Sequence, residues 1–143
     1  MIGAIIAKQA IRSGFDALNK GDLEKFLKAW HEDCIWIYHG NVKAGGRVSG
    51  KAEVNKWFEE FFRQFPHRKF TLAHIAVENI FDMMGNNTVC AAWSLELTNK
   101  DGFNFANRGI TVVRLKAAKA VQGEDFLEIS DGDDFKRAWG DIK

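Results

Sequence analysis

The chain has 143 residues, of which 46% are hydrophobic and 27% charged, a composition that excludes a disordered chain and fits one globular domain over 1–143. Twenty basic and nineteen acidic residues leave a net charge of +1, so the charge predicts no nucleic-acid partner. No apolar stretch is long enough for a signal or a membrane span, which predicts no membrane partner and a cytoplasmic location.

The chain begins with the apolar period of helices. Over 5–19, apolar side chains recur at steps of three and four, which is typical of an amphipathic helix. Gly21 suits the left-handed position past its end, and Asp22 is a good N-cap. A second, short helix is therefore predicted over 23–30.

A short aromatic strand and a glycine-rich loop follow. Residues 34–39 are rich in β-branched and aromatic side chains, as expected of a strand with both faces covered. The four glycines of 40–50 predict a loop. A third helix then starts at Ser49 or Gly50 and ends at Pro66.

After Pro66 the pattern changes from the helical period to the alternation of strands. The strands that this alternation predicts are 70–81, 88–98, 103–115 and 126–130. Residues 116–123 are expected to form an extended hairpin tip, and 134–139 one terminal helical turn. Helices that precede antiparallel strands cover one face of the sheet. We therefore expect an α+β domain in which three N-terminal helices close a cone-shaped, curved antiparallel sheet around a ligand cavity.

Aromatic side chains are frequent, with twelve Phe and five Trp. Those on elements that should face one another across the cone are Trp36, Trp57, Phe61, Trp93 and Phe105. Core packing explains most of them without any further role. As cavity lining, they predict a flat apolar or aromatic ligand.

Three segments resemble a known family: residues 17–37, the glycine- and lysine-containing helix start from Gly45 to Val54, and residues 126–140. They resemble SnoaL-like proteins, in the superfamily of nuclear transport factor 2, ketosteroid isomerase and limonene epoxide hydrolase. The resemblance covers nearly the whole chain and implies the cone fold and a homodimer. Its motifs are structural, and this fold hosts many functions.

The resemblance indicates where chemistry would occur. Ketosteroid isomerase-like members carry a catalytic aspartate near the end of the first strand, where this chain has Tyr38 with His39 beside it. Tyr38 can donate a hydrogen bond to a substrate oxygen, and His39 can transfer a proton near neutral pH. Alternation lets only one of them face the cavity. The alternative is an aromatic core residue beside a histidine at the rim.

The last strand and its end supply the candidate carboxylates, because limonene epoxide hydrolase and SnoaL place an acid or base aspartate there. The candidates are Glu128, Asp131, Asp133 and Asp134. We prefer Asp131 because it is still close to the strand. An apolar cavity would raise the pKa of such a carboxyl group, which suits acid–base catalysis. The alternative is that this run is a solvated turn and helix N-cap.

Asn107 and Arg108 are candidate ligand-binding residues. Limonene epoxide hydrolase pairs an arginine with a carboxylate in this region, but Gly109 and Ile110 follow Arg108 here, so that pattern is not reproduced. Thr111 falls where ketosteroid isomerase has its second, proton-donating aspartate. Arg108 can orient a ligand carboxylate or form a surface ion pair.

These patterns predict a protein that binds a small apolar or aromatic molecule. Cofactor-free acid–base chemistry of the isomerase, cyclase or hydratase type would use Asp131 with His39 or Tyr38. The histidines and cysteines lack the spacing of a metal site, and neither a metal nor a cofactor is predicted. A non-catalytic ligand-binding or protein-interaction module and an accessory subunit of a ring-hydroxylating dioxygenase are the alternatives.

Overall fold

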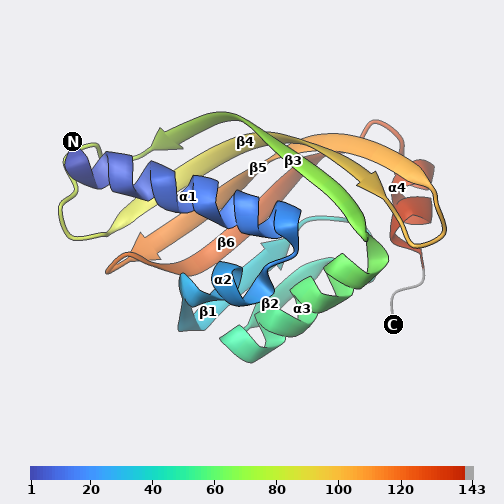
Figure 1. Ribbon diagram of the computed structural model, residues 1–143, viewed down its shortest axis with the longest axis horizontal. Coiled ribbons are helices and arrows are strands. Elements are labelled where there is room, and N and C mark those ends of the chain that lie inside the picture. Colours follow the sequence, from blue (N-terminus) through green and yellow to red (C-terminus); the bar gives the residue numbers. More distant parts are fainter. Residues whose placement is uncertain (141–143) are drawn as a thin grey trace.

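The structure, a computed structural model, describes residues 1–140 and consists of one curved sheet with helices on its concave side (Figure 1). In chain order, the elements are α1 (Ile2–Lys20), α2 (Leu23–Lys28), β1 (Trp30–Tyr38), β2 (Gly46–Ser49), α3 (Lys51–Gln64), β3 (His67–Val77), β4 (Asn87–Thr98), β5 (Asn104–Lys116), β6 (Lys119–Glu128) and α4 (Gly132–Trp139). The sheet order is β2-β1-β6-β5-β4-β3.

The predicted α+β class and the curved sheet under three N-terminal helices are confirmed. Two details differ. The sheet is mixed, because β1 pairs in parallel with β6, and it is not closed, because β2 and β3 are its edges. The predicted loop over 40–50 contains the short strand β2.

The predicted hairpin tip over 116–123 is mostly strand. Strands β5 and β6 continue to a two-residue turn at Ala117 and Ala118, both with positive φ (47° and 64°). Asn and Gly are the residues that favour such turns, and neither is present here. The sequence therefore gave no turn signal at this position.

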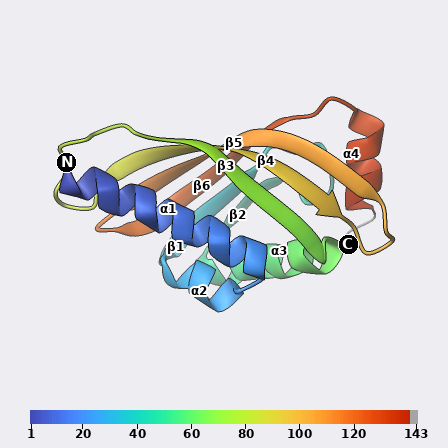
Figure 2. The same ribbon diagram turned by 45° about the horizontal axis from the view of Figure 1, so that its top comes forward.

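Helix α1 packs on β3 and β4, and α3 packs on β1 and β2, so that the sheet arches over both helices (Figure 2). The inner face of α1 consists of apolar residues three or four apart: Ala4, Ala7, Ile11, Phe15 and Leu18. This spacing places them on one stripe of the helix, which buries them against the sheet.

Arg68, at the start of β3, joins the ends of α1 and α3. Its Nε donates to the carbonyl oxygen of Leu18 (2.7 Å) and its Nη1 to that of Phe65 (3.0 Å), while the guanidinium lies 4.0 Å from the centre of the Phe62 ring. Carbonyl groups at helix ends lack partners within the helix. Arg68 donates to that of Phe65 and adds a second donor to that of Leu18, which also accepts from the Gly21 N–H over 3.2 Å. Burial lowers the pKa of Arg68 from its usual value.

Helix α4 lies at the opposite end of the sheet from the start of α1 (Figure 1). Asp131 caps its N-terminus by accepting from the backbone N–H groups of Asp133 (2.9 Å) and Asp134 (3.0 Å). The side chains of Phe135 and Trp139 are buried. This short helix therefore covers one end of the cone.

Candidate functional site

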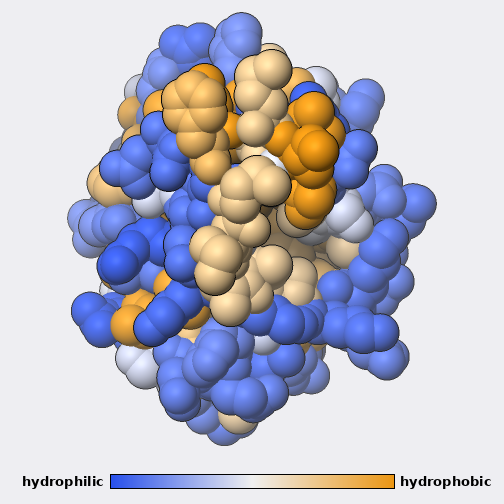
Figure 3. Space-filling view, turned by 90° about the vertical axis from the view of Figure 1, so that its left-hand side faces the viewer, coloured by the Kyte–Doolittle hydropathy of each residue, from blue (hydrophilic) through white to orange (hydrophobic). Residues whose placement is uncertain are grey.

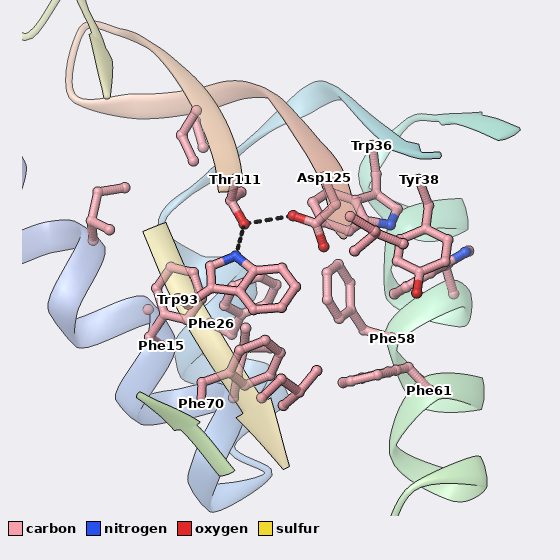
Figure 4. Close-up of a pocket in the computed structure, with 18 of the residues that line it drawn as sticks. Phe15, Phe26, Trp36, Tyr38, Phe58, Phe61, Phe70, Trp93, Thr111 and Asp125 are labelled. Carbon is pink, nitrogen blue, oxygen red and sulfur yellow. Dashed lines mark hydrogen bonds between the residues drawn. The ribbon is translucent and has the colours of Figure 1, made fainter. Parts of the chain in front are cut away.

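A cavity of about 100 Å³ lies between the sheet and the helices, and its wall is mostly aromatic and aliphatic (Figure 4). Four polar residues contribute to this wall: Tyr38, Asn107, Thr111 and Asp125. Only Asp125 among them is a carboxylic acid, and it is 8% exposed. A carboxyl group in such surroundings is a recognised indication of a functional site.

Asp125 belongs to a hydrogen-bonded chain of three side chains (Figure 4). The indole N–H of Trp93 donates to Thr111 Oγ1 over 2.8 Å, and Thr111 donates to Asp125 Oδ1 over 2.5 Å. Because the Thr111 oxygen already accepts from Trp93, its single proton is directed to the carboxylate. The second oxygen of Asp125 has no side-chain or backbone partner among the described residues.

Strand register aligns the polar residues in one row. Tyr38 on β1 is the partner of Asp125 on β6, and Asp125 is the partner of Thr111 on β5. Residues that are partners on adjacent strands point to the same face of a sheet. The sheet itself therefore presents a phenol, a carboxyl group and a hydroxyl group side by side.

Burial raises the pKa of Asp125 to about 7, although the hydrogen bond from Thr111 and the charge of His39 act in the opposite direction. At neutral pH, the group is therefore close to half protonated and can both take and give a proton. Burial, and secondarily the charge of Asp125, raises the pKa of Tyr38 well above its usual value. Tyr38 thus stays a neutral phenol that can donate a hydrogen bond.

Gly109 makes room for Trp93. A Cβ atom at Gly109 would lie 2.8 Å from the Trp93 ring and 2.4 Å from the carbonyl oxygen of Phe126, closer than real contacts allow. The indole can therefore lie across β5 and reach Thr111. We expect any larger residue at this position to break the Trp93–Thr111–Asp125 chain.

The cavity reaches the surface near the start of α1. Three of its lining residues, Ala10, Ala29 and Ala118, are exposed. Figure 3 shows this end of the molecule, where apolar side chains gather. The exposed large apolar residues of α1 and of the loop after β3 are Met1, Ile2, Ile5, Ile6, Ile80, Phe81, Met83 and Met84. These side chains form an exposed apolar patch, and none of them lines the cavity itself.

Most of the sequence-predicted binding residues line this cavity. They are Trp36, Trp57, Phe61, Trp93, Phe105 and Asn107. Tyr38 lines it as well, with its side chain buried. Their contact with a ligand remains a prediction, but the structure brings all of them to one enclosed space.

Asp131, the preferred carboxylate, lies outside the cavity, because it is exposed and its side chain caps α4. Asp133 and Asp134 are exposed in the first turn of that helix. Glu128 is exposed and pairs with Arg108, with 2.6 Å between Oε2 and Nε. The carboxylate that lines the cavity is therefore Asp125 and not Asp131. Arg108, predicted to bind the ligand, does not line the cavity.

His39 also lies outside the cavity. Its Nε2 is 2.5 Å from Glu124 Oε2, and its ring stacks on that of Phe126 with 4.8 Å between the ring centres. Adjacent residues of a strand point to opposite faces. Of the pair predicted from the sequence, Tyr38 is thus the residue that faces the cavity.

Asp125 was not among the predicted carboxylates, because the last strand was expected to begin at Phe126, one residue after Asp125. A usable signal was present. Leu127 and Ile129 alternate as the inward-facing residues of that strand, and two steps back along the same face is Asp125. Extending the alternation would have placed this carboxylate inside.

Within residues 1–140, no group of three or more His, Cys, Asp or Glu side chains is arranged to hold a metal ion. In the same part of the chain, the helices are too short or too polar to cross a membrane.

A family model described as a SnoaL-like domain matches residues 11–123. An NTF2-like protein of unknown function from Burkholderia pseudomallei K96243 is 18% identical, with a TM-score of 0.77 over 93% of this chain and 96% of that chain. TerC, co-crystallised with polyporic acid, is 18% identical, with a TM-score of 0.73 over 94% and 98%. A candidate polyketide cyclase from Pseudomonas putida KT2440 is 19% identical, with a TM-score of 0.69 over 87% and 93%. At these identities, the likeness shows the fold. No curated protein matches the chain.

Proposed function

Because the chain belongs to the SnoaL-like family, as the match over residues 11–123 shows, we propose that it binds a small aromatic molecule and catalyses a cofactor-free acid–base reaction. The observation that carries this proposal is Asp125. It is a buried carboxyl group whose pKa is raised to about 7 and which lines an apolar cavity. Such a group can transfer protons in both directions at neutral pH.

The simplest reaction of this arrangement is an enolisation. The carboxylate of Asp125 takes a proton from a carbon next to a carbonyl group. The electron pair of that C–H bond forms a C=C double bond, and the π pair of the C=O bond moves to the carbonyl oxygen. The Tyr38 O–H can donate a hydrogen bond to this oxygen as its negative charge develops. Asp125 then returns the proton to another carbon, which completes an isomerisation or prepares a ring closure.

Thr111 and Trp93 are positioning residues in this proposal. Since Thr111 donates to Oδ1 of Asp125, the other carboxylate oxygen is left to meet the substrate. Trp93 fixes the direction of the Thr111 proton by donating to the same hydroxyl oxygen. The carboxylate is thus oriented before any ligand binds, which is a condition for efficient proton transfer.

The names of two fold relatives agree with an aromatic ligand. One is a candidate polyketide cyclase, and the other was crystallised with polyporic acid. Those ligands and activities belong to these proteins. For this chain, the support comes from the aromatic wall and from the carboxylate within it.

Hydrogen–deuterium exchange of a probe tests the proposal. We expect the protein in heavy water to accelerate exchange of the methyl protons of acetophenone, followed by NMR. Asp125→Asn should reduce the acceleration at least about 100-fold, the usual contribution of a positioned base. Asp131→Asn, which changes an exposed carboxylate, should retain it. Saturable binding without exchange in the wild type would instead support the non-catalytic ligand-binding module.

We also propose that the chain forms a homodimer through the outer face of the sheet. Ile110 on β5 and Phe126 on β6 are register partners on that face, and each is 45% exposed. Neighbouring exposed apolar residues on a sheet face favour association. The proposal needs no contribution of the partner to the cavity.

A further inference from the structure

The start of α1 is apolar on every side. Ala4 and Ala7 face the sheet and are buried, whereas the larger side chains of Ile2, Ile5 and Ile6 are 66%, 56% and 56% exposed. A helix that is apolar all round is normally covered all round. Here the fold covers the face with the small side chains and leaves the face with the large ones in solvent. The three isoleucines therefore indicate contact with a partner.

The loop after β3 shows the same reversal. Asp82 is buried and accepts from the backbone N–H of Met84 over 3.1 Å, and Asn79 accepts from that of Phe81 over 2.9 Å. Polar side chains thus hold the loop backbone in place. The side chains of Phe81, Met83 and Met84 are left 73%, 71% and 75% exposed. The loop is built to present apolar groups to its surroundings.

These two segments form a single patch, with the turn between β5 and β6 beside it (Figure 3). A Cβ atom at Gly3 would overlap the carbonyl oxygen of Asp82, and the backbone N–H of Ala118 donates to the carbonyl oxygen of Gly85 over 3.0 Å. All three methionines of the chain belong to this patch. Their flexible side chains adapt to irregular apolar surroundings. Contiguous exposed apolar residues of this kind mark an interaction surface.

Basic side chains accompany the patch. Those on its segments and the adjoining turn are Lys8, Arg114, Lys116 and Lys119, and the acidic ones are Glu78 and the buried Asp82. Positive charge therefore predominates at this end, although the whole chain is nearly neutral at +1. Lysine is depleted in protein–protein interfaces, whereas Lys and Arg beside an apolar surface bind the headgroups of anionic lipids. The combination favours a lipid surface over a second protein.

We propose that this end of the molecule docks on the surface of an anionic lipid bilayer. The apolar patch enters the boundary between headgroups and lipid chains, and the four basic side chains contact the headgroups. The prediction of no membrane partner rested on the absence of a spanning or signal segment, and docking on a surface requires neither. The inference is independent of the proposed reaction. Docking would also bring the cavity opening at Ala10 and Ala118 close to the lipid.

Sedimentation with lipid vesicles gives the first test. We expect the protein to sediment with vesicles of phosphatidylcholine mixed with phosphatidylglycerol. Its affinity for these vesicles should exceed that for vesicles of phosphatidylcholine alone at least about tenfold, because each basic residue near an anionic surface adds to binding. Added salt should weaken the binding, since it screens exposed charges. Failure to sediment with the anionic vesicles would overturn the inference.

Variants of exposed residues separate the two contributions. Phe81→Ser combined with Met84→Ser should weaken binding to the anionic vesicles at least about tenfold, through lost apolar burial. Lys8→Gln combined with Lys116→Gln should weaken it at least about fivefold.

The control for the charge variant is Lys69→Gln combined with Lys100→Gln. Both lysines are exposed, one at the start of β3 and one in the turn after β4. This variant should bind the vesicles like the wild type. Equal binding by all three double variants would contradict docking through the patch.

The methyl groups of Met83 and Met84, labelled with ¹³C, distinguish lipid from a second copy of the chain. We expect their NMR signals to broaden when the vesicles contain a nitroxide-labelled lipid. Without lipid, the signals should stay the same as the protein concentration rises. Signals that change with protein concentration, together with no binding to vesicles, would assign the patch to a second copy and overturn the lipid surface.

Discussion

Asp125 combines burial with a hydrogen bond to only one of its two oxygens. Burial favours the neutral acid, and the Thr111 proton favours the carboxylate; burial has the larger effect, so the pKa rises to about 7. The charged form of Asp125 therefore lowers the stability of the folded protein relative to the neutral form. This has a measurable consequence for stability.

The first prediction concerns the pH dependence of unfolding. The folded protein keeps the Asp125 proton up to about pH 7, whereas an unfolded chain releases it near about pH 4. Between these values the folded state binds more protons, so this stabilisation is complete below the unfolded pKa and is lost as the pH rises through the folded one. The decrease should amount to at most about 4 kcal/mol.

Denaturant unfolding of the wild type and of Asp125→Asn from pH 4 to pH 8 measures this effect. The variant cannot ionise at this position, so the difference in unfolding free energy between the two should change over this range in favour of the variant. Asp131→Asn provides the matched exposed control. A constant difference across the range would contradict the raised pKa.

The second prediction concerns Thr111. Its hydrogen bond lowers the pKa of Asp125, so Thr111→Val should raise that pKa further. We expect the carboxyl carbon of Asp125 to titrate at a higher pH by NMR, and the pH profile of acetophenone exchange to move in the same direction. Thr71→Val, on an exposed position of β3, should leave both unchanged. An unshifted titration would show that the hydroxyl does not tune this group.

Residue identity at the site was partly readable from the sequence. Tyr38 was found because the strand alternation and the resemblance agree at its position. Asp125 was missed because the turn before β6 contains neither Asn nor Gly. The sequence therefore carries no turn signal for where this strand begins. Its pKa depends on burial and on Thr111, fourteen residues away in sequence, which no local pattern contains.

At the scale of elements, one cation on the sheet joins the ends of the two long helices. Arg68 is close to the C-terminal ends of both α1 and α3, where backbone carbonyl groups attract positive charge. It binds one carbonyl group from each end. Arg68 therefore links the ends of two helices that contribute residues to the cavity wall.

The third prediction is therefore a loss of stability in Arg68→Met. The carbonyl group of Phe65 loses the Arg68 donor, and that of Leu18 keeps only the Gly21 N–H, which should lower the unfolding free energy by about 1–3 kcal/mol. Lys69→Met, at the exposed neighbouring position, is the control and should change it by less than about 0.5 kcal/mol. Equal stability of both variants in denaturant unfolding would exclude this role of Arg68.

At the scale of the whole molecule, the order of elements was sufficient for the fold class, because helices that precede strands leave few arrangements. The parallel pairing of β1 with β6 was not predictable, since it joins segments about ninety residues apart without a local signal. The cavity was expected from the cone, but its volume was not. That volume depends on how Trp36, Trp93 and their neighbours pack around Gly109 and Gly123.

The fourth prediction concerns assembly. If the outer face of the sheet is the dimer interface, Ile110→Asp should convert the dimer to a monomer, because it places a charge in an apolar contact. Analytical ultracentrifugation of the wild type and the variant measures the mass. Lys116→Asp, at the end of the same strand, is a control for the change in charge. A monomeric wild type would rule out the dimer.

The turn at Ala117 and Ala118 offers a practical advantage for such experiments. Left-handed backbone is unfavourable by roughly 1–2 kcal/mol for a residue with a side chain such as alanine, and both residues adopt it. Replacing the pair with Asn-Gly should recover part of this strain. A background protein with that turn would tolerate damaging variants, so that loss of activity could be distinguished from loss of folding.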